Sequence, residues 1–501
     1  REIARESSAE ADSHLIPWVG ARTKDELRRL GHQFGFPTAP VRSVGAAIED
    51  PQFTFRRFFV EGSGELAGLT YPGVPWRILQ ASPASEPAPD TSAPGQPLAG
   101  LRVLDLSWVW SGPMVTSILA DLGAEVFKVE NPERPDPARA RGPARRDGVP
   151  VSGHQLELSP YFNQLGHGKK SINIDLTKDE GRELVLELAR HCDVVVENMR
   201  PGVMKRLGIG YDELRKVNQR VVMLSMSTLG QEGPSSQIMG YGMVMSGLAG
   251  LESIVGYGDE TMGMFNLAIS DPTAGSHAIV ALLAAIHRQR VDGQSAWIDL
   301  SQTECTMEAL LEQILETQLN GSTVVPGNSH TSFSPHGVFR SAGNDEWIAV
   351  AARTDAERDR MRDLIGGGAD LDESLEKWLV SRTAADAATD LRSIGVSASP
   401  VMSFEALEAD GWFERRGFVR DLGHPDLGPQ TIGAAPWSLN GHRISPSRSS
   451  PYLGEHGREI LATVLGLDTR AIDELVGRGV VGEPSPGADR ARNNFDERQE
   501  A

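Results

Sequence analysis

The sequence predicts an α/β protein in which a smaller α+β domain is inserted into a large domain with a doubly wound parallel sheet. Two observations lead to this prediction. From residue 100 onward, short apolar runs alternate with helical patterns, which is the order of a parallel, Rossmann-like sheet. After residue 321 the alternation stops, and helical stretches surround a single apolar run.

The strands of the large domain, expected within residues 98–321, are predicted at short apolar runs. A helical pattern follows the first run, from residue 112 to 123. Thr177 and Glu180 have the spacing of a capping box, which predicts a helix that ends at His191. The predicted strands are Arg102–Leu106, Glu125–Val129, Ser171–Asp175, Asp193–Glu197, Val221–Ser225 and Ala296–Leu300.

The smaller domain is expected at residues 322–405, with one strand at Trp347–Ala351. Residues 406–482 are interpreted as a return segment to the large domain. A polar, charged stretch at 483–501 is interpreted as a disordered tail. Helices are predicted near 355–365 and 384–394 in the smaller domain, and at 457–465 and 469–475 in the return segment.

The N-terminal part repeats a C-terminal part at a constant offset of 360 positions. Chance similarity rarely keeps one register over so long a stretch. Residues 1–81 are therefore interpreted as the C-terminal remnant of a preceding unit, joined by a linker rich in Pro, Ser and Ala at 82–97. Two unrelated helix-turn segments are the alternative. Matching pairs are Leu15 and Leu375, Trp18 and Trp378, Arg22 and Arg382, Gly35 and Gly395, Asp50 and Asp410, and Arg56 and Arg416.

The composition argues against several classes of protein. A net charge of −19 argues against a nucleic-acid partner, and no apolar run approaches the ~20 residues that a bilayer requires. Two cysteines, Cys192 and Cys305, are too few for a disulfide framework or a zinc cage, which fits a reducing cytoplasm. The chain begins with Arg1 rather than Met, which suggests a fragment or a processed form.

The most informative local segment is Ser270–Ser276, which opens an apolar helix. Pro272 suits the first helical position, so Asp271 is expected at the N-cap. In the same place, a carboxylate held ionised by the helix dipole and backbone N–H groups can attack an activated acyl group. The residue pattern alone leaves both roles open. A Walker phosphate loop, a dinucleotide fingerprint, a zinc-protease motif and a nucleophile elbow are all missing.

Eight segments together resemble one family. In chain order they are LAGLRVLDLSWVWSGP (98–113), LADLGAEVFKVENPERPDPAR (119–139), GKKSINIDL (168–176), DVVVENMRPGVMKRLG (193–208), STLGQEGP (227–234), ISDPTAG (269–275), DGQSAWIDLS (292–301) and SPYLGEHGREIL (450–461). They resemble, in family order, blocks of the class III CoA-transferases, the CaiB–BaiF group. Residues 10–81 resemble the end of the small domain and the return segment of the same family.

The resemblance implies an enzyme that moves CoA from an acyl-CoA to a free carboxylic acid. It places the family's nucleophilic Asp on Asp271, which would form a mixed anhydride and then an aspartyl-CoA thioester. CoA and acyl-CoA would be substrates, with no permanently bound cofactor and no metal. The family architecture is an open ring that interlocks with a second copy. We therefore expect a homodimer, or a pseudo-dimer within a tandem chain.

Contacts with CoA carry over from the same blocks. The turn after the first strand, the third block and the turn after the fourth strand align with CoA-binding segments of the family. The residues are Val109, Trp110, Ser111, Lys170, Ile172, Asn198, Met199 and Arg206.

Two alternative functions stay open. A 2-methylacyl-CoA racemase shares this fold but needs a His–Asp pair, where this chain has Gly240-Tyr241-Gly242-Met243; His277 is a possible stand-in. A non-catalytic scaffold subunit of a tandem CoA-transferase is the second alternative. Trp110, at a position where the family often has a small or polar residue, supports the scaffold.

Overall fold

The computed structural model describes residues 8–82, 96–146, 148–257, 268–325 and 327–488. The chain forms two compact units. The first comprises residues 1–251, 266–321 and 416–501, and the second comprises 252–265 and 322–415. The smaller unit therefore extends ten residues beyond the predicted boundary at 405 and also takes in chain from Glu252 onward.

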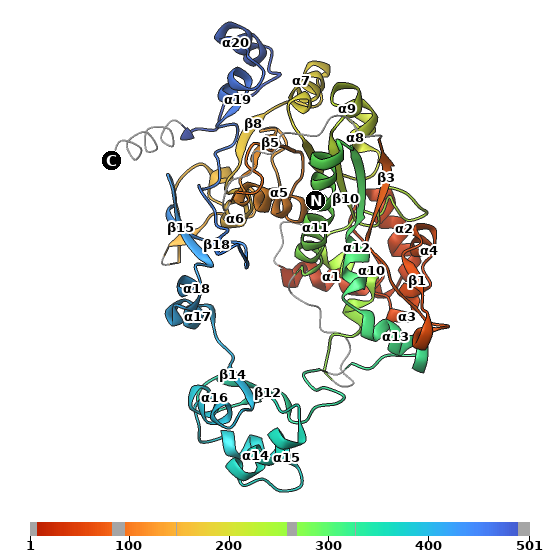
Figure 1. The fold of residues 1–501 in the computed structure, drawn as a ribbon, viewed down its shortest axis with the longest axis vertical. Helices are drawn as coiled ribbons and strands as arrows, with labels where there is room; N and C mark the ends of the chain where they lie inside the picture. Colours follow the sequence, from red (N-terminus) through yellow and green to blue (C-terminus); the bar gives the residue numbers. More distant parts are fainter. Residues whose placement is uncertain (1–7, 83–95, 147, 258–267, 326, 489–501) are drawn as a thin grey trace. The chain divides into compact units, whose positions relative to one another are not determined.

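A seven-stranded sheet organises the first unit (Figure 1). Its order is β3-β11-β10-β9-β4-β5-β8, and all neighbouring strands are parallel except β3, which pairs antiparallel with β11. The six strands predicted from apolar runs are confirmed. The strands are β3 (Trp76–Ala81), β4 (Arg102–Asp105), β5 (Glu125–Glu130), β8 (Lys170–Asn173), β9 (Val194–Glu197), β10 (Val222–Ser227) and β11 (Ala296–Ser301).

The strand order reverses next to β4. The chain proceeds outward from β4 to β5 and β8, and then returns to β9 on the other side of β4. In a doubly wound sheet, the loops that leave such neighbouring strands in opposite directions open a crevice at the carboxyl ends of the strands. The fold therefore places the expected ligand crevice at the ends of β4 and β9.

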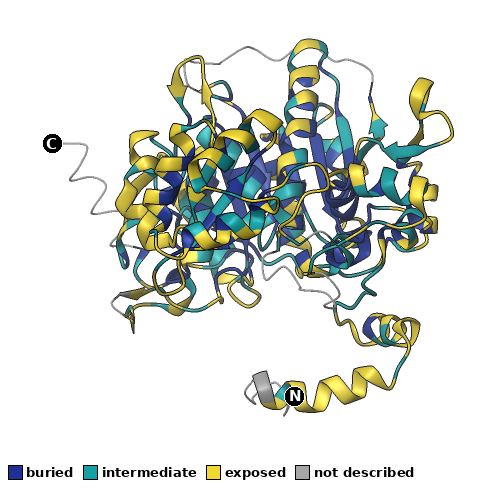
Figure 2. Cartoon of the chain, turned by 90° about the horizontal axis from the view of Figure 1, so that it is seen from below, coloured by how far each residue is buried: buried dark blue, intermediate teal, exposed yellow. Residues whose placement is uncertain are grey.

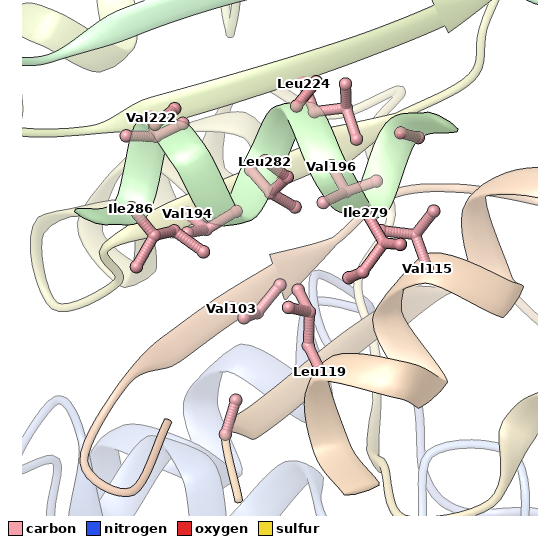
Figure 3. Packing of buried hydrophobic residues seen from close by; sticks show 14 of the residues in the cluster. Val103, Val115, Leu119, Val194, Val196, Val222, Leu224, Ile279, Leu282 and Ile286 are labelled. Atoms are coloured by element: carbon pink, nitrogen blue, oxygen red, sulfur yellow. The ribbon is translucent and has the colours of Figure 1, made fainter. Parts of the chain in front are cut away.

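Helices cover both faces of this sheet. On one face, α5 (Ser111–Asp121) and α11 (Ser270–Asp292) pack on a core that includes Val194, Leu282 and Ile286 (Figure 3). The other face is covered by α7 (Asp179–Arg190), α9 (Tyr211–Val217), α19 (Gly457–Thr463) and α20 (Thr469–Gly477). Because both faces are buried, strands such as β9 are apolar at successive positions rather than alternating. Figure 2 shows the resulting pattern of buried strands and outwardly exposed helix faces.

The predicted capping box before α7 is wrong. The helix begins at Asp179, and Lys178 occupies the N-cap without a side-chain cap. Thr177 instead donates its hydroxyl and its backbone N–H to the Asp175 carboxylate, at 2.7 and 3.0 Å. Thr177 therefore belongs to a local turn at the end of β8, and its side chain does not cap α7.

The N-terminal segment is integrated into the first unit. Its last strand, β3, forms the edge of the large sheet beside β11. Arg56 is only 3% exposed, and its guanidinium donates to Asp299 and Glu304 at 2.5 Å each. Residues interpreted from sequence as a remnant thus complete the sheet of the unit that follows them. Further elements here are α1 (Ser8–Gly20), α2 (Lys24–Phe34), α3 (Val44–Ile48), α4 (Pro51–Arg56), β1 (Phe59–Glu61) and β2 (Thr70–Pro72).

The remaining elements of the first unit connect these layers. They are α6 (Pro160–Gly166), α8 (Val203–Arg206), α10 (Gly242–Ala249), α12 (Gln302–Glu308), α13 (Leu311–Asn320), and the short strand pairs β6 (Arg145–Arg146) with β7 (Val149–Pro150), β15 (Val419–His424) with β16 (Gly428–Gly433), and β17 (Ser438–Leu439) with β18 (His442–Arg443). None of the described helices is long and apolar enough to span a membrane.

The second unit is the expected α+β domain. Three antiparallel strands pack with helices around Ile348, Leu375 and Leu391, each fully buried. The predicted strand and both predicted helices are present. The elements are β12 (His336–Arg340), β13 (Trp347–Ala351), β14 (Ser397–Pro400), α14 (Asp355–Ile365), α15 (Leu371–Leu379), α16 (Ala384–Ser393), α17 (Phe404–Asp410) and α18 (Trp412–Arg415).

The start of the predicted disordered tail is packed on the first unit. Ser485 donates its backbone N–H to Leu453 at 2.8 Å and its hydroxyl to Glu157 at 2.5 Å. Ala488 is 2% exposed. Polar composition predicted fraying here, but Ser485 forms hydrogen bonds with buried partners instead. Residues 489–501, and 83–95 of the predicted linker, lie outside the described residues.

Candidate active site

At the switch point, where the sheet topology predicts a ligand crevice, the turns that follow β4 and β9 meet. The Trp108 backbone N–H donates to the Asn198 side-chain oxygen at 2.8 Å, and the Asn198 amide donates to the Trp108 carbonyl at 2.7 Å. This pair of bonds holds Val109, Trp110 and Ser111 beside Asn198. Four of the predicted CoA-binding residues are thus brought together, and Asn198 uses its amide to shape the turn.

Asp271 lies at the same place, but not as a helix cap. Helix α11 begins two residues earlier than predicted, at Ser270 rather than Pro272, so the predicted N-cap is wrong. The Asp271 carboxylate instead lies near the backbone N–H of Ser111, the first residue of α5, which acts to lower the pKa of this carboxyl. The carboxylate therefore lies where the positive ends of two helices converge, a favourable site for an anion.

Two glycines allow this close arrangement. A Cβ at Gly275, one turn along α11, would lie 3.1 Å from the Met114 sulfur and 3.4 Å from the Ser111 carbonyl oxygen. A Cβ at Gly242, the first residue of α10, would lie 2.9 Å from an Asp271 carboxylate oxygen. Side chains at these positions would push α5 and α10 away from the carboxylate.

Burial raises the pKa of Asp271 to about 6, while the Arg141 charge and the Ser111 N–H act in the opposite direction. The net shift is opposite to the one that helix dipoles alone would cause. A carboxylate with this pKa is ionised at neutral pH yet poorly solvated, which suits a nucleophile.

Arg141 and Tyr161 are neighbours of this site that sequence reasoning did not identify. The Arg141 guanidinium carbon lies 4.3 Å from the Tyr161 ring centre, and the Trp110 ring packs edge-on at 5.6 Å from the same ring. Among the described residues, the buried Tyr161 hydroxyl has no hydrogen-bond partner. The only available signal was a run of arginines after the second strand; nothing local distinguishes Tyr161.

Lys170 and Ile172 are not brought to this crevice. Lys170 is the first residue of β8, at the amino edge of the parallel sheet, where it pairs with Glu125 and Glu459 at 2.7 Å each. The Ile172 side chain is fully buried in the core. The carboxyl ends of the strands carry the crevice, so a role in CoA binding for these two side chains is not supported by their placement.

The other two predicted contacts follow β9 on the crevice side. Met199 is half-buried, and its backbone N–H donates to the Glu197 carboxylate at 2.7 Å. Arg206 is exposed at the end of α8. Its cationic side chain remains a candidate for binding a phosphate.

His277, the possible second base, is engaged elsewhere. One ring nitrogen lies 2.9 Å from the Thr273 carbonyl oxygen and the other lies 2.5 Å from the Glu308 carboxylate. Within the described part of the chain, no cluster of three or more His, Cys, Asp or Glu side chains could hold a metal ion.

Comparisons with known proteins agree with this architecture. The model of CoA-transferase family III matches residues 1–93 and 98–457. Succinyl-CoA–D-citramalate CoA-transferase of Chloroflexus aurantiacus is 29% identical over 77% of this chain and 99% of its own length. Succinate–glutarate CoA-transferase of Agrobacterium fabrum is 30% identical over 75% of this chain and 97% of its own length. The crystal structure of a CaiB/BaiF family protein from Brucella suis superimposes with a TM-score of 0.65 at 27% identity, covering 74% of this chain and 99% of that protein.

Proposed function

The chain belongs to CoA-transferase family III, and we propose that it transfers CoA between an acyl-CoA and a carboxylic acid with Asp271 as the nucleophile. One observation carries this proposal: a partly buried carboxylate at the switch point of the sheet that lies near the first N–H of a neighbouring helix instead of capping its own. A capping aspartate would be occupied within its helix. Asp271 instead lies beside the turn between β4 and α5.

In the proposed reaction, Asp271 forms two kinds of covalent intermediate, a mixed anhydride and a thioester. Asp271 attacks the thioester carbonyl, the C–S bond breaks, and a mixed anhydride and CoA thiolate form. The thiolate then attacks the aspartyl carbonyl, which releases the donor acid and leaves an aspartyl-CoA thioester. The acceptor carboxylate attacks that thioester and expels the thiolate, which finally attacks the acyl carbon of the acceptor and regenerates Asp271. Because a carboxylate is also a good leaving group, each step is reversible.

The backbone around Asp271 supports this chemistry. The Ser111 N–H lies near the carboxylate, and Asp271 itself belongs to the first turn of α11. N–H groups in this position can stabilise the negative charge that develops on the attacked carbonyl oxygen. Burial also removes water that would otherwise hydrolyse an anhydride.

We propose that the acceptor is a dicarboxylic acid and that Arg141 binds its second carboxylate. Arg141 lies over Tyr161 beside Asp271 and supplies a fork of donors suited to a carboxylate. Relatives named for succinate, glutarate and citramalate act on dicarboxylates. Arg141→Met should raise the KM for succinate about 10-fold or more and change the KM for a monocarboxylate little. Equal changes for both acids would remove Arg141 from acceptor recognition.

We further propose a cytoplasmic protein that carries the closing part of a duplicated unit in residues 1–81 and pairs as an interlocked dimer or pseudo-dimer. Local contacts support the duplication. Arg22 and Arg382 stack on Trp18 and Trp378 at 3.9 and 4.2 Å, respectively. Each arginine also donates to the carbonyl of its own tryptophan, at 2.7 and 3.1 Å.

Exchange of labelled succinate into succinyl-CoA tests the transferase. The wild type should catalyse the exchange, and Asp271→Asn should not. CoA binding without exchange by the wild type would favour the scaffold alternative. Loss of the α-proton of a 2-methylacyl-CoA into deuterated water, without exchange of acid, would favour the racemase.

A further inference from the structure

The turn between β4 and α5 contains a backbone conformation that its sequence does not favour. Val109 has a φ of 69°, in the left-handed region. This region costs a residue other than glycine roughly 1–2 kcal/mol, and β-branched side chains rarely occupy it. Two residues later, the Ser111 N–H lies near the Asp271 carboxylate and acts to lower its pKa. Something in the surroundings must therefore hold the turn in this shape.

Asp136 makes the contact that holds Val109. One oxygen of its carboxylate accepts hydrogen bonds from both the Val109 N–H, at 3.0 Å, and the Ala138 N–H, at 2.9 Å. The bond to Ala138 fixes the direction of the carboxylate within its own loop. The bond to Val109 ties that loop to the strained residue.

Lys128, on β5, links the other end of the turn to the same carboxylate. Its ammonium donates to the Ser107 carbonyl at 2.8 Å and lies 3.2 Å from the second oxygen of Asp136. Lys128 is 0% exposed and Asp136 is 2% exposed. Removing two such charges from water costs several kcal/mol per ion, and an apolar pair would often be at least as stable. Global stability alone is therefore a weak reason for an ion pair here.

We propose that Asp136 and Lys128 are positioning residues of the transferase: they hold Val109 in the left-handed region and so direct the Ser111 N–H at Asp271. Neither side chain contacts substrate in this proposal. The inference rests on the proposed function of Asp271, and it assigns the ion pair a role in kcat rather than in binding of CoA.

Asp136→Glu and Asp136→Asn test the pair. The first keeps the charge but displaces the oxygen that accepts from Val109, and the second keeps the shape but removes the charge. We expect kcat to fall about 10- to 100-fold in each, because small misplacements at a reacting centre have effects of this size. Should Asp136→Asn fail to fold, Asp136→Glu carries the test.

A second-site change gives a readout that a merely structural role would not produce. Glycine adopts a positive φ without strain, so Val109→Gly should restore at least about 5-fold of the lost kcat in each Asp136 variant. In the wild-type background the same change should not raise kcat. Asp121→Asn is the matched control. It removes a buried carboxylate that pairs with His167 at 3.2 Å at the opposite end of α5, and it should lower the melting temperature without lowering kcat.

Three results would overturn the proposal: folded Asp136→Glu with wild-type kcat, no recovery on adding Val109→Gly, or an equal loss of kcat in Asp121→Asn. Failure of the proposed function itself is recognised separately, because Asp271→Asn would then retain exchange activity. An inactive Asp271→Asn beside a fully active Asp136→Glu would refute the positioning role alone.

Discussion

Two aspartates occupy the same dipeptide, Asp-Pro, at the start of a helix, and the structure uses them in opposite ways. Asp50 is the N-cap of α4 and accepts from the backbone N–H of Gln52 at 2.6 Å, and it also pairs with Arg42. Asp271 lies inside the first turn of α11, near the first N–H of a different helix. The comparison shows that Asp-Pro specifies where a helix begins, whereas the surrounding fold decides what the carboxylate binds.

The largest difference between Asp271 and Asp50 should appear in the CoA-transfer activity of their variants. Asp271→Asn should lower CoA transfer on the order of 10⁴-fold or more, because no other group can form the covalent intermediate. Asp50→Ala, measured well below its melting temperature, should retain wild-type exchange. Comparable losses of activity in the two variants would contradict the claim that Asp271 is catalytic and Asp50 only structural.

The pH dependence of catalysis sharpens the comparison further. With the pKa of Asp271 raised to about 6, kcat/KM should fall about tenfold per pH unit below that value, since only the carboxylate is nucleophilic. Asp50→Ala should leave this midpoint unchanged. A profile that is flat between pH 5 and 7 would argue against a raised pKa at the nucleophile.

At neutral to alkaline pH, Asp271→Asn should raise the free energy of unfolding, whereas Asp50→Ala should lower it. The folded protein holds the Asp271 proton more tightly than the unfolded chain, so this group makes stability decrease as the pH rises from about 4 through 6. Asp271→Asn should therefore stabilise the protein by roughly 1–2 kcal/mol at pH 8, after allowance for partial exposure, and by little at pH 4. Urea unfolding at the two pH values measures the difference. A destabilised Asp271→Asn at pH 8 would contradict this sign.

Loss of the Asp50 cap is the smallest effect. Asp50→Ala removes the bond to Gln52 and should cost roughly 0.5–2 kcal/mol of unfolding free energy at neutral pH. Asp50→Asn can still cap the helix and should recover most of that loss. An Asp50→Asn variant as unstable as Asp50→Ala would mean that the ion pair with Arg42, rather than the cap, is responsible.

Much of the fold could be predicted because its determinants are local. Apolar runs such as Val194–Glu197 identify strands buried on both faces, and alternating helices then imply a parallel sheet. The edge strand β3 could not be predicted in the same way. Its residues are only half-buried, and their pairing with β11 joins segments that are more than 200 residues apart.

The site was predicted less completely, for a related reason. The resemblance pointed to Asp271 and to the turn at Val109, but the sequence could not show that the carboxylate lies near the Ser111 N–H of α5. Arg141 lies in a loop and Tyr161 lies on α6, and only tertiary packing brings the two side chains together. Conversely, the resemblance aligned Lys170 with a CoA-binding segment of the family. The alignment could not show that Lys170 begins β8 and so lies away from the carboxyl ends of the strands.

Chemical trapping of the aspartyl thioester tests the central claim most directly. The protein would be incubated with succinyl-CoA, reduced with borohydride, digested and mapped by peptide mass spectrometry. The account predicts that Asp271 alone is converted to the alcohol, with a loss of mass that requires succinyl-CoA, while the Asp50 and Asp136 peptides from the same digest are unchanged. Active protein in which Asp271 keeps its full mass, or in which another residue is reduced, would contradict the assignment of Asp271 as the nucleophile.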